Sequence, residues 1–157
     1  MLPLATIHSR INTSLGTSNW YNVRQELIDQ FSAATLDDDP MHLDVEWARS
    51  HTPFGGTIAA GFWTTSMLIR MSHDIGFIDE FAGGHGRFYA LNYGFDKLRL
   101  VAPVPVGVRI RGHMKLLGCR ERSDGSRLLS IDVAVEIENR ERPALIADWL
   151  ALIVPQG

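Results

Sequence analysis

The stretch "FGGTIAAGFWTTSMLI", residues 54–69, decides the fold because it carries no charged residue. It is shorter than the roughly 20 apolar residues that a helix needs to cross a bilayer, so no membrane span is predicted. Glycine and alanine dominate its first half, and the period-2 alternation of a half-exposed strand is missing. We therefore predict a helix from Gly56 to Ile69 that is buried on all sides. A buried strand followed by a turn is the alternative.

The C-terminal half of the sequence has the pattern of an antiparallel sheet. Apolar and polar residues alternate in "VGVRIRGHMKL" (106–116) and again in "RLLSIDVAVEIE" (127–138), and the "SDGS" between them (123–126) is typical of a hairpin turn. "FYALNYGFDKLRLV" (88–101) predicts another strand. "PALIADWLALIVP" (143–155) is apolar on both faces in its second half, as an inner strand is.

Two helices are predicted before the apolar stretch. Val23, Leu27, Ile28 and Phe31 recur at helical spacing, behind a possible Asn22 cap with Gln25 three residues later. A second, short helix is expected from Asp44. The sequence therefore predicts an α+β fold, in which one domain (residues 1–157) wraps an antiparallel sheet around a central apolar helix.

Composition excludes several classes of function. The formal net charge of -3 comes from scattered residues, and no basic run could follow a nucleic-acid backbone. The one cysteine, Cys119, has no internal disulfide partner, and the N-terminal residues lack the features of a signal peptide. We expect a cytoplasmic protein that binds neither nucleic acid nor membrane.

The candidate chemistry lies in "TLDDDPMHLD", residues 35–44, where Asp37 precedes His42 across Pro40 on a loop expected between the two helices. Such an acidic run is more often turn and cap chemistry than catalysis. Clustered aspartates can also bind Mg²⁺ or Ca²⁺, but no glycine-hinged loop or bidentate glutamate follows at calcium-site spacing, so no metal is predicted. Of the six histidines, only His42 lies in such a pattern.

Three segments carry a resemblance to a known family. "FSAATLDDDPMHLDVEWARSHTPFGGTIAAGFWTTSML" (31–68), "LNYGFDKLRLVAPVPVGVRIRG" (91–112) and "RPALIADWLALIV" (142–154) resemble the MaoC-like, or (R)-specific enoyl-CoA hydratase, family, including its NodN-like branch. The resemblance covers nearly the whole chain and implies a hot-dog fold.

The resemblance also implies roles for particular residues. Asp37 and His42 would together hold the water that adds to an enoyl thioester. Gly56 and Gly61 would lie where a helix start offers backbone N–H groups to the thioester oxygen. Ser66 matches a helix serine that faces the site in some relatives, although a serine inside a helix often bonds back to its own helix.

Three positions depart from the family pattern. Leu36 replaces a glycine, so a positive φ there would be strained. Asp39 stands where relatives often have asparagine, and it adds a negative charge near Asp37. Ala60 replaces a histidine that commonly precedes the helix glycine.

The resemblance further implies a coenzyme A or acyl-carrier-protein substrate, no metal or redox cofactor, and a homodimer joined edge to edge. Phosphate groups need cations, so Arg87, Lys97 and Arg99, near "DKLRL", are the candidate carrier-binding residues. A solvated strand face is the alternative explanation of these charges.

The predicted function is therefore an (R)-specific enoyl-thioester hydratase, or the reverse dehydratase. A non-catalytic acyl-thioester binder, or a silent subunit of a heteromeric dehydratase, remains as the alternative. A thioesterase is disfavoured, because hot-dog thioesterases place a carboxylate on the central helix and residues 56–69 contain none.

Overall fold

The structure is a computed structural model that describes residues 1–84 and 88–156. Its elements in chain order are α1 (Leu4–His8), β1 (Ser14–Thr17), β2 (Tyr21–Asn22), α2 (Gln25–Thr35), α3 (Pro40–Leu43), α4 (Val45–His51), α5 (Gly61–Ile75), α6 (Phe77–Ala82), β3 (Phe88–Leu100), β4 (Arg109–Glu121), β5 (Arg127–Ile137) and β6 (Leu145–Pro155).

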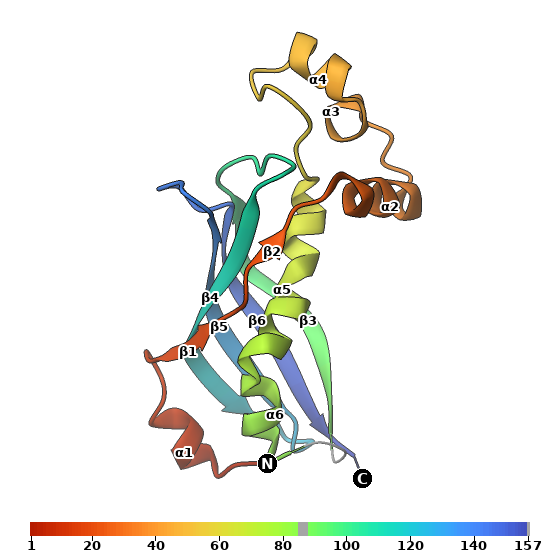
Figure 1. Cartoon of the computed structure of the whole chain (residues 1–157). Helices are drawn as coiled ribbons and strands as arrows, with labels where there is room; N and C mark the ends of the chain where they lie inside the picture. Colours follow the sequence, from red (N-terminus) through yellow and green to blue (C-terminus); the bar gives the residue numbers. More distant parts are fainter. Residues whose placement is uncertain (85–87, 157) are drawn as a thin grey trace.

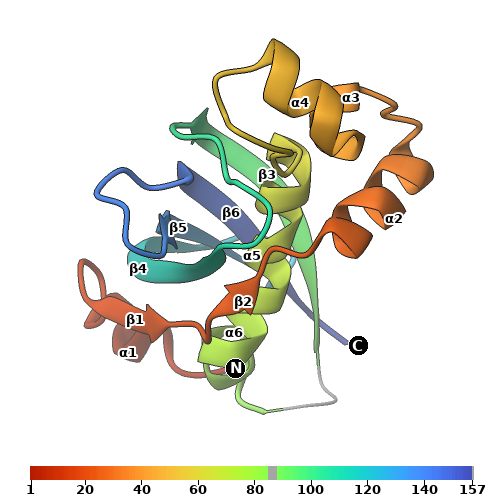
Figure 2. The same cartoon turned by 45° about the horizontal axis from the view of Figure 1, so that its top comes forward.

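The strands form one antiparallel sheet in the order β1-β4-β5-β6-β3, and β2 also pairs with β4. This order confirms the predicted β4–β5 hairpin and the inner position of β6. The sheet curves around α5, and the segment α2–α4 overhangs the start of that helix (Figures 1 and 2). The predicted α+β arrangement, a sheet around a central helix, is correct.

Helix α5 differs from its prediction in bounds and in burial. It begins at Gly61 and not at Gly56, and it continues to Ile75, where Gly76 ends it in a left-handed conformation. Trp63, Leu68 and Met71 pack into the core. The helix is not buried all round, because only one side faces the sheet: Phe62, on the other side, is 72% exposed.

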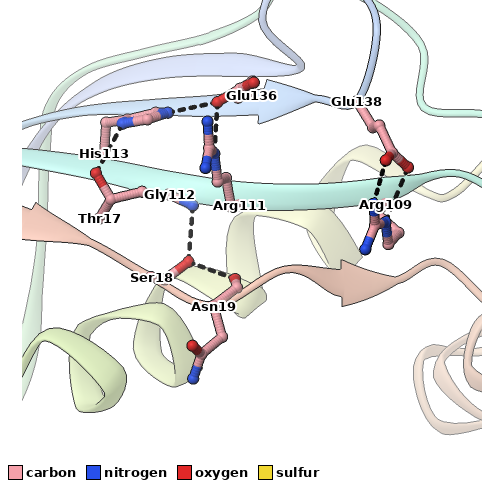
Figure 3. A network of polar contacts seen from close by, with 9 residues as sticks. All are labelled: Thr17, Ser18, Asn19, Arg109, Arg111, Gly112, His113, Glu136 and Glu138. Carbon is pink, nitrogen blue, oxygen red and sulfur yellow. Dashed lines mark hydrogen bonds and ion pairs between the residues drawn. The ribbon is translucent and has the colours of Figure 1, made fainter.

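The N-terminal segment, which the sequence patterns did not reveal, docks on β4 through polar contacts (Figure 3). The hydroxyl of Ser18 accepts a hydrogen bond from the Gly112 N–H at 2.9 Å and donates to the Asn19 carbonyl at 2.9 Å. On the next strand, Glu136 accepts from Arg111 at 2.7 Å and lies 2.7 Å from His113 Nε2. Because the short strands β1 and β2 carry little apolar alternation, their pairing with β4 could not be read from hydrophobicity.

The predicted helices before α5 form, with one change of cap. Asp44 caps α4 as expected, because its carboxylate accepts from the Trp47 N–H at 2.9 Å. The Asn22 cap is wrong: Asn22 lies in β2, and α2 begins after Arg24 without a side-chain cap. The side chain of Gln25 is instead used in contacts between elements, described below.

Strand β3 forms an edge of the sheet and, among the described residues, pairs only with β6. Several of its apolar side chains are exposed, namely Tyr89, Leu91, Tyr93 and Leu100. An open edge with apolar side chains is a surface on which another strand can pair.

Candidate active site

His42 lies on the short helix α3, and not on a loop as expected. Pro40 is the first residue of that helix, where a proline costs no hydrogen bond and its fixed φ favours helix. Asp39 caps the helix, since its carboxylate accepts from the Met41 N–H at 3.0 Å. The capping interpretation of the acidic run is therefore correct for Asp39.

The imidazole of His42 is buried and has a fixed orientation. Its Nδ1 lies 2.8 Å from the carbonyl oxygen of Ile58, and the Ile58 N–H in turn donates to the Met41 carbonyl at 3.2 Å. A carbonyl only accepts, so Nδ1 carries the proton and Nε2 of the neutral ring carries the lone pair. The structure thus prepares Nε2 to accept a proton.

Gln25 holds the same region together, and sequence reasoning had treated it only as part of a helix cap. Its Nε2 donates to the His42 carbonyl at 2.7 Å and to Asp29 at 2.8 Å, while its Oε1 accepts from the Thr57 hydroxyl at 2.6 Å. One amide therefore links α2, α3 and the segment before α5.

His42 borders a cavity of about 290 Å³ at the start of α5. Its other lining residues are Met41, Ile58, Ala59, Gly61, Thr64, Leu100, Val101, Ala102, Pro103, Val104 and Ala144. Apart from His42, Thr64 is the only one of these described lining residues that has a polar side chain. The arrangement suits an acyl chain with a few polar contacts at its reactive end.

Gly61, at the first position of α5, lies close to the end of β3. A Cβ added there would lie 2.3 Å from Cδ1 of Leu100, so a larger residue at position 61 would displace the Leu100 side chain. The first N–H groups of a helix have no acceptor within it. In contrast, the Ala59 amide already donates to the Val104 carbonyl at 2.8 Å, so the candidate donors to a ligand are at Gly61 and Phe62.

Asp37 borders a second cavity, of about 330 Å³, on the α2 side of α3. Its N–H donates to the Ser32 carbonyl at 3.1 Å, and its Oδ1 lies 3.4 Å from the Asp39 N–H. Leu36, directly before it, has φ of 59°, so the strained conformation expected from the missing glycine is present. No hydrogen bond joins the side chains of Asp37 and His42 within residues 1–84 and 88–156, so their joint action on one water stays a prediction.

The other predicted site residues lie apart from His42. Gly56 is in the segment after α4 and does not line the cavity. Ser66 is exposed, and its hydroxyl donates to the Phe62 carbonyl of its own helix at 2.8 Å. Lys97 lies 3.8 Å from the Asp148 carboxylate. Arg87 falls outside the described residues.

Arginine residues do lie close to the cavity rim. Exposed Arg99 directly precedes the cavity-lining residues of β3. Arg142, which sequence reasoning did not single out, donates to the carbonyl of cavity-lining Val101 at 3.1 Å. Its sequence context, an alternation of arginine and glutamate in a turn, gives no signal that could have distinguished it.

Two further properties of the described part of the chain bear on the site. Across residues 1–84 and 88–156, no three His, Cys, Asp or Glu side chains are grouped so that they could hold a metal ion. No helix in these ranges has the length and apolar character needed to span a membrane.

Comparison with known proteins identifies the family. The family model of the MaoC like domain matches residues 6–136. The chain belongs to this family. Nodulation protein N of Rhizobium leguminosarum bv. viciae is 42% identical over 155 residues, which cover 97% of this chain and 91% of that protein. The 3-hydroxyacyl-thioester dehydratase Z of Mycobacterium tuberculosis (strain ATCC 25618 / H37Rv) is 34% identical over 151 residues, which cover 96% and 95%.

Solved structures confirm the hot-dog fold of this MaoC-like chain. The MaoC-like dehydratase from Rhodospirillum rubrum superposes with a TM-score of 0.72 at 21% identity, over 94% of both chains. An (R)-hydratase from A. caviae involved in PHA biosynthesis superposes with a TM-score of 0.67 at 18% identity, over 90% of this chain and 94% of that one.

Proposed function

We propose that this MaoC-like protein is an (R)-specific enoyl-thioester hydratase, or acts in reverse as a 3-hydroxyacyl-thioester dehydratase. The observation that carries the proposal is the buried His42 ring, whose Nδ1 is bound to Ile58 and which borders a nearly apolar cavity beside the start of α5. The names of the dehydratase and (R)-hydratase relatives support this reaction class.

In the proposed hydration, the oxygen of a water molecule forms a bond to the β-carbon of the enoyl thioester. The electron pair of the double bond moves toward the thioester oxygen, and the water gives a proton to Nε2 of His42. As the enolate pair returns to form the new C–H bond at the α-carbon, the imidazolium gives that proton back, so the His42 ring is neutral again. Asp37 would orient the water. The amides of Gly61 and Phe62 would stabilise the negative charge on the thioester oxygen, aided by the dipole of α5.

Hydration of trans-2-butenoyl-CoA (crotonyl-CoA), followed by loss of enoyl absorbance and chiral analysis of the 3-hydroxy product, tests the proposal. We expect the (R)-3-hydroxy product, formed without added metal or redox cofactor. If neither this substrate nor medium-chain trans-2-enoyl-CoA is hydrated by the wild-type protein, the hydratase proposal fails.

A non-catalytic acyl-thioester binder, or a silent subunit of a heteromeric dehydratase, is the second candidate. It is favoured by one observation, that Asp37 and His42 border separate cavities. Binding of butanoyl-CoA without hydration of any enoyl thioester would establish the binding function.

Thioester hydrolysis has less support than hydration. Helix α5 is longer than expected and includes one carboxylate, Asp74. That carboxylate accepts from the Tyr21 hydroxyl at 2.5 Å and the Asn19 N–H at 3.1 Å, and lies 3.0 Å from Arg70. It therefore joins the N-terminal segment to the helix and is already used by these partners.

We also propose that the protein works as a homodimer in which two β3 edges pair. The open edge of β3 and the exposed Leu91 on that strand support this assembly. Light scattering should give twice the chain mass at micromolar concentration, and Leu91→Asp should dissociate the dimer. Ile146→Asp, a matched change of an exposed apolar residue on β6, should not. A monomeric wild-type protein would contradict the assembly.

A further inference from the structure

Three successive residues of α5, namely Thr64, Thr65 and Ser66, carry hydroxyl groups, and they differ in how those groups are bonded. The hydroxyl of Thr65 donates to the Gly61 carbonyl at 2.9 Å, and that of Ser66 donates to the Phe62 carbonyl at 2.8 Å. Both therefore bond back to the residue four positions earlier, as helical hydroxyls commonly do. The Ala60 carbonyl stands in the same relation to Thr64, but it accepts only from the Thr64 backbone N–H, at 3.2 Å, and not from the hydroxyl.

The hydroxyl of Thr64 is buried without a partner. The residue is 2% exposed, and within the described part of the chain its Oγ1 has no hydrogen-bonding partner. A buried polar group left unpaired destabilises the fold, and proteins keep few of them. An unpaired hydroxyl in this position therefore requires an explanation.

The position of Thr64 in the lining of the His42 cavity explains the unpaired hydroxyl. Among the described residues that line the 290 Å³ cavity, Thr64 and His42 are the two with polar side chains, and the Thr64 hydroxyl itself is buried. An unsubstituted enoyl thioester has one hydrogen-bond acceptor in its acyl group, the thioester carbonyl oxygen, and the rest of that group is hydrocarbon. A substrate in this cavity therefore offers an acceptor to the unpaired Thr64 hydroxyl.

We propose that Thr64 is a substrate-binding residue whose hydroxyl donates a hydrogen bond to the thioester carbonyl oxygen in the His42 cavity. This inference rests on the proposed hydratase function. Threonine in a helix populates two χ1 rotamers, so a single rotation can turn the hydroxyl toward the substrate. Negative charge gathers on this oxygen during water addition, so the bond strengthens in the transition state and contributes to kcat.

The test compares Thr64→Val, which keeps the shape of the side chain and removes its hydroxyl, with the wild-type protein. We expect a loss of about 10²-fold in kcat on crotonyl-CoA, the usual effect of removing one donor to such an oxygen. Thr64→Ser keeps the hydroxyl and should recover most of the rate. Thr65→Val is the matched control, because its hydroxyl is bonded within the helix, and it should leave kcat unchanged.

Binding of butanoyl-CoA, measured by calorimetry, separates this inference from the proposed reaction. Butanoyl-CoA has the carbonyl oxygen but no double bond to hydrate, so it reports on Thr64 even if the wild-type protein shows no hydration. Weaker binding by Thr64→Val than by Thr65→Val supports the inference. It is overturned if Thr64→Val equals the wild-type protein in hydration rate or, where no variant hydrates, in affinity for butanoyl-CoA.

Discussion

The Nδ1 atom of His42 donates to the carbonyl oxygen of Ile58 over 2.8 Å, at a position where the histidine is only 7% exposed. Residues 42 and 58 belong to the overhanging segment and to the approach to α5, so this bond joins the two parts that form the cavity. It also fixes which ring nitrogen can accept a proton. The predictions for the candidate site follow from this contact.

His42→Ala and Asp37→Asn should each remove most turnover, because a positioned acid or base typically contributes about 10² to 10⁴ in rate. If both residues act on one water, the double variant should be scarcely slower than either single variant. Rates on crotonyl-CoA and circular dichroism of each variant check this. Wild-type activity in Asp37→Asn would remove Asp37 from the mechanism.

Gln25→Glu should lower both stability and kcat, although the side chains have nearly the same shape. A carboxylate cannot donate to the His42 carbonyl, and leaving a buried partner unsatisfied costs about 1 to 3 kcal/mol. Gln30→Glu, an exposed change on the same helix, is the matched control. Thermal unfolding and hydration rates measure the two effects. A variant that loses stability alone would limit Gln25 to a role in folding.

The sequence predicted elements whose apolar pattern is regular, and it missed contacts that depend on tertiary placement. The alternation in residues 106–116 and 127–138 correctly indicated β4 and β5, because one face of each strand is buried. The start of α5 at Gly61 could not be read from composition, since Ala60, which precedes it, has no side chain that could cap the helix. At Leu36 the resemblance indicated only that a positive φ would be strained, and the structure has φ of 59° there.

The site was predicted less completely than the fold, because its contacts depend on tertiary placement. His42 was found from its motif, but the bonds of Gln25 join residues 17 and 32 positions away. Thr64 and Ser66 are two positions apart on one helix, and only the three-dimensional arrangement shows which of them borders the cavity. Spacing along a chain identifies candidates, whereas burial and hydrogen-bond partners distinguish between them.

Arg99→Ala should raise KM for crotonyl-CoA by about 10-fold with little change in kcat, because loss of a charge-assisted phosphate contact weakens binding before the reaction. The crotonyl thioester of N-acetylcysteamine has no phosphate, so its KM should not change. Arg122→Ala, at the β4–β5 hairpin, controls for loss of a positive charge. An unchanged KM for the coenzyme A substrate would exclude Arg99 from carrier binding.

Acid should weaken the sheet partly through Glu136. The Arg111 hydrogen bond, followed by that of His113, lowers the pKa of this carboxyl below its ordinary value of 4.5. The unfolded chain therefore binds the proton more readily, so the stabilisation is complete above pH 4.5 and is lost as pH falls through the lower folded pKa. Thermal unfolding should show a wild-type advantage over Glu136→Gln at pH 7 that shrinks in acid. Glu141→Gln, in the exposed β5–β6 turn, should show no such change.

Leu36→Gly should stabilise the protein, because Leu36 ends α2 in the left-handed conformation with φ of 59°. That conformation costs a residue with a Cβ roughly 1 to 2 kcal/mol, and the greater freedom of glycine in the unfolded chain offsets part of the gain. The side chain is 87% exposed, so little packing is lost, and we expect a net gain of about 1 kcal/mol. Leu36→Ala removes the side chain but keeps the strain, so its Tm should stay near that of the wild-type protein. Because Asp37 follows directly, hydration by Leu36→Gly should equal or exceed the wild-type rate, and a slower variant would show that the strained backbone contributes to positioning Asp37.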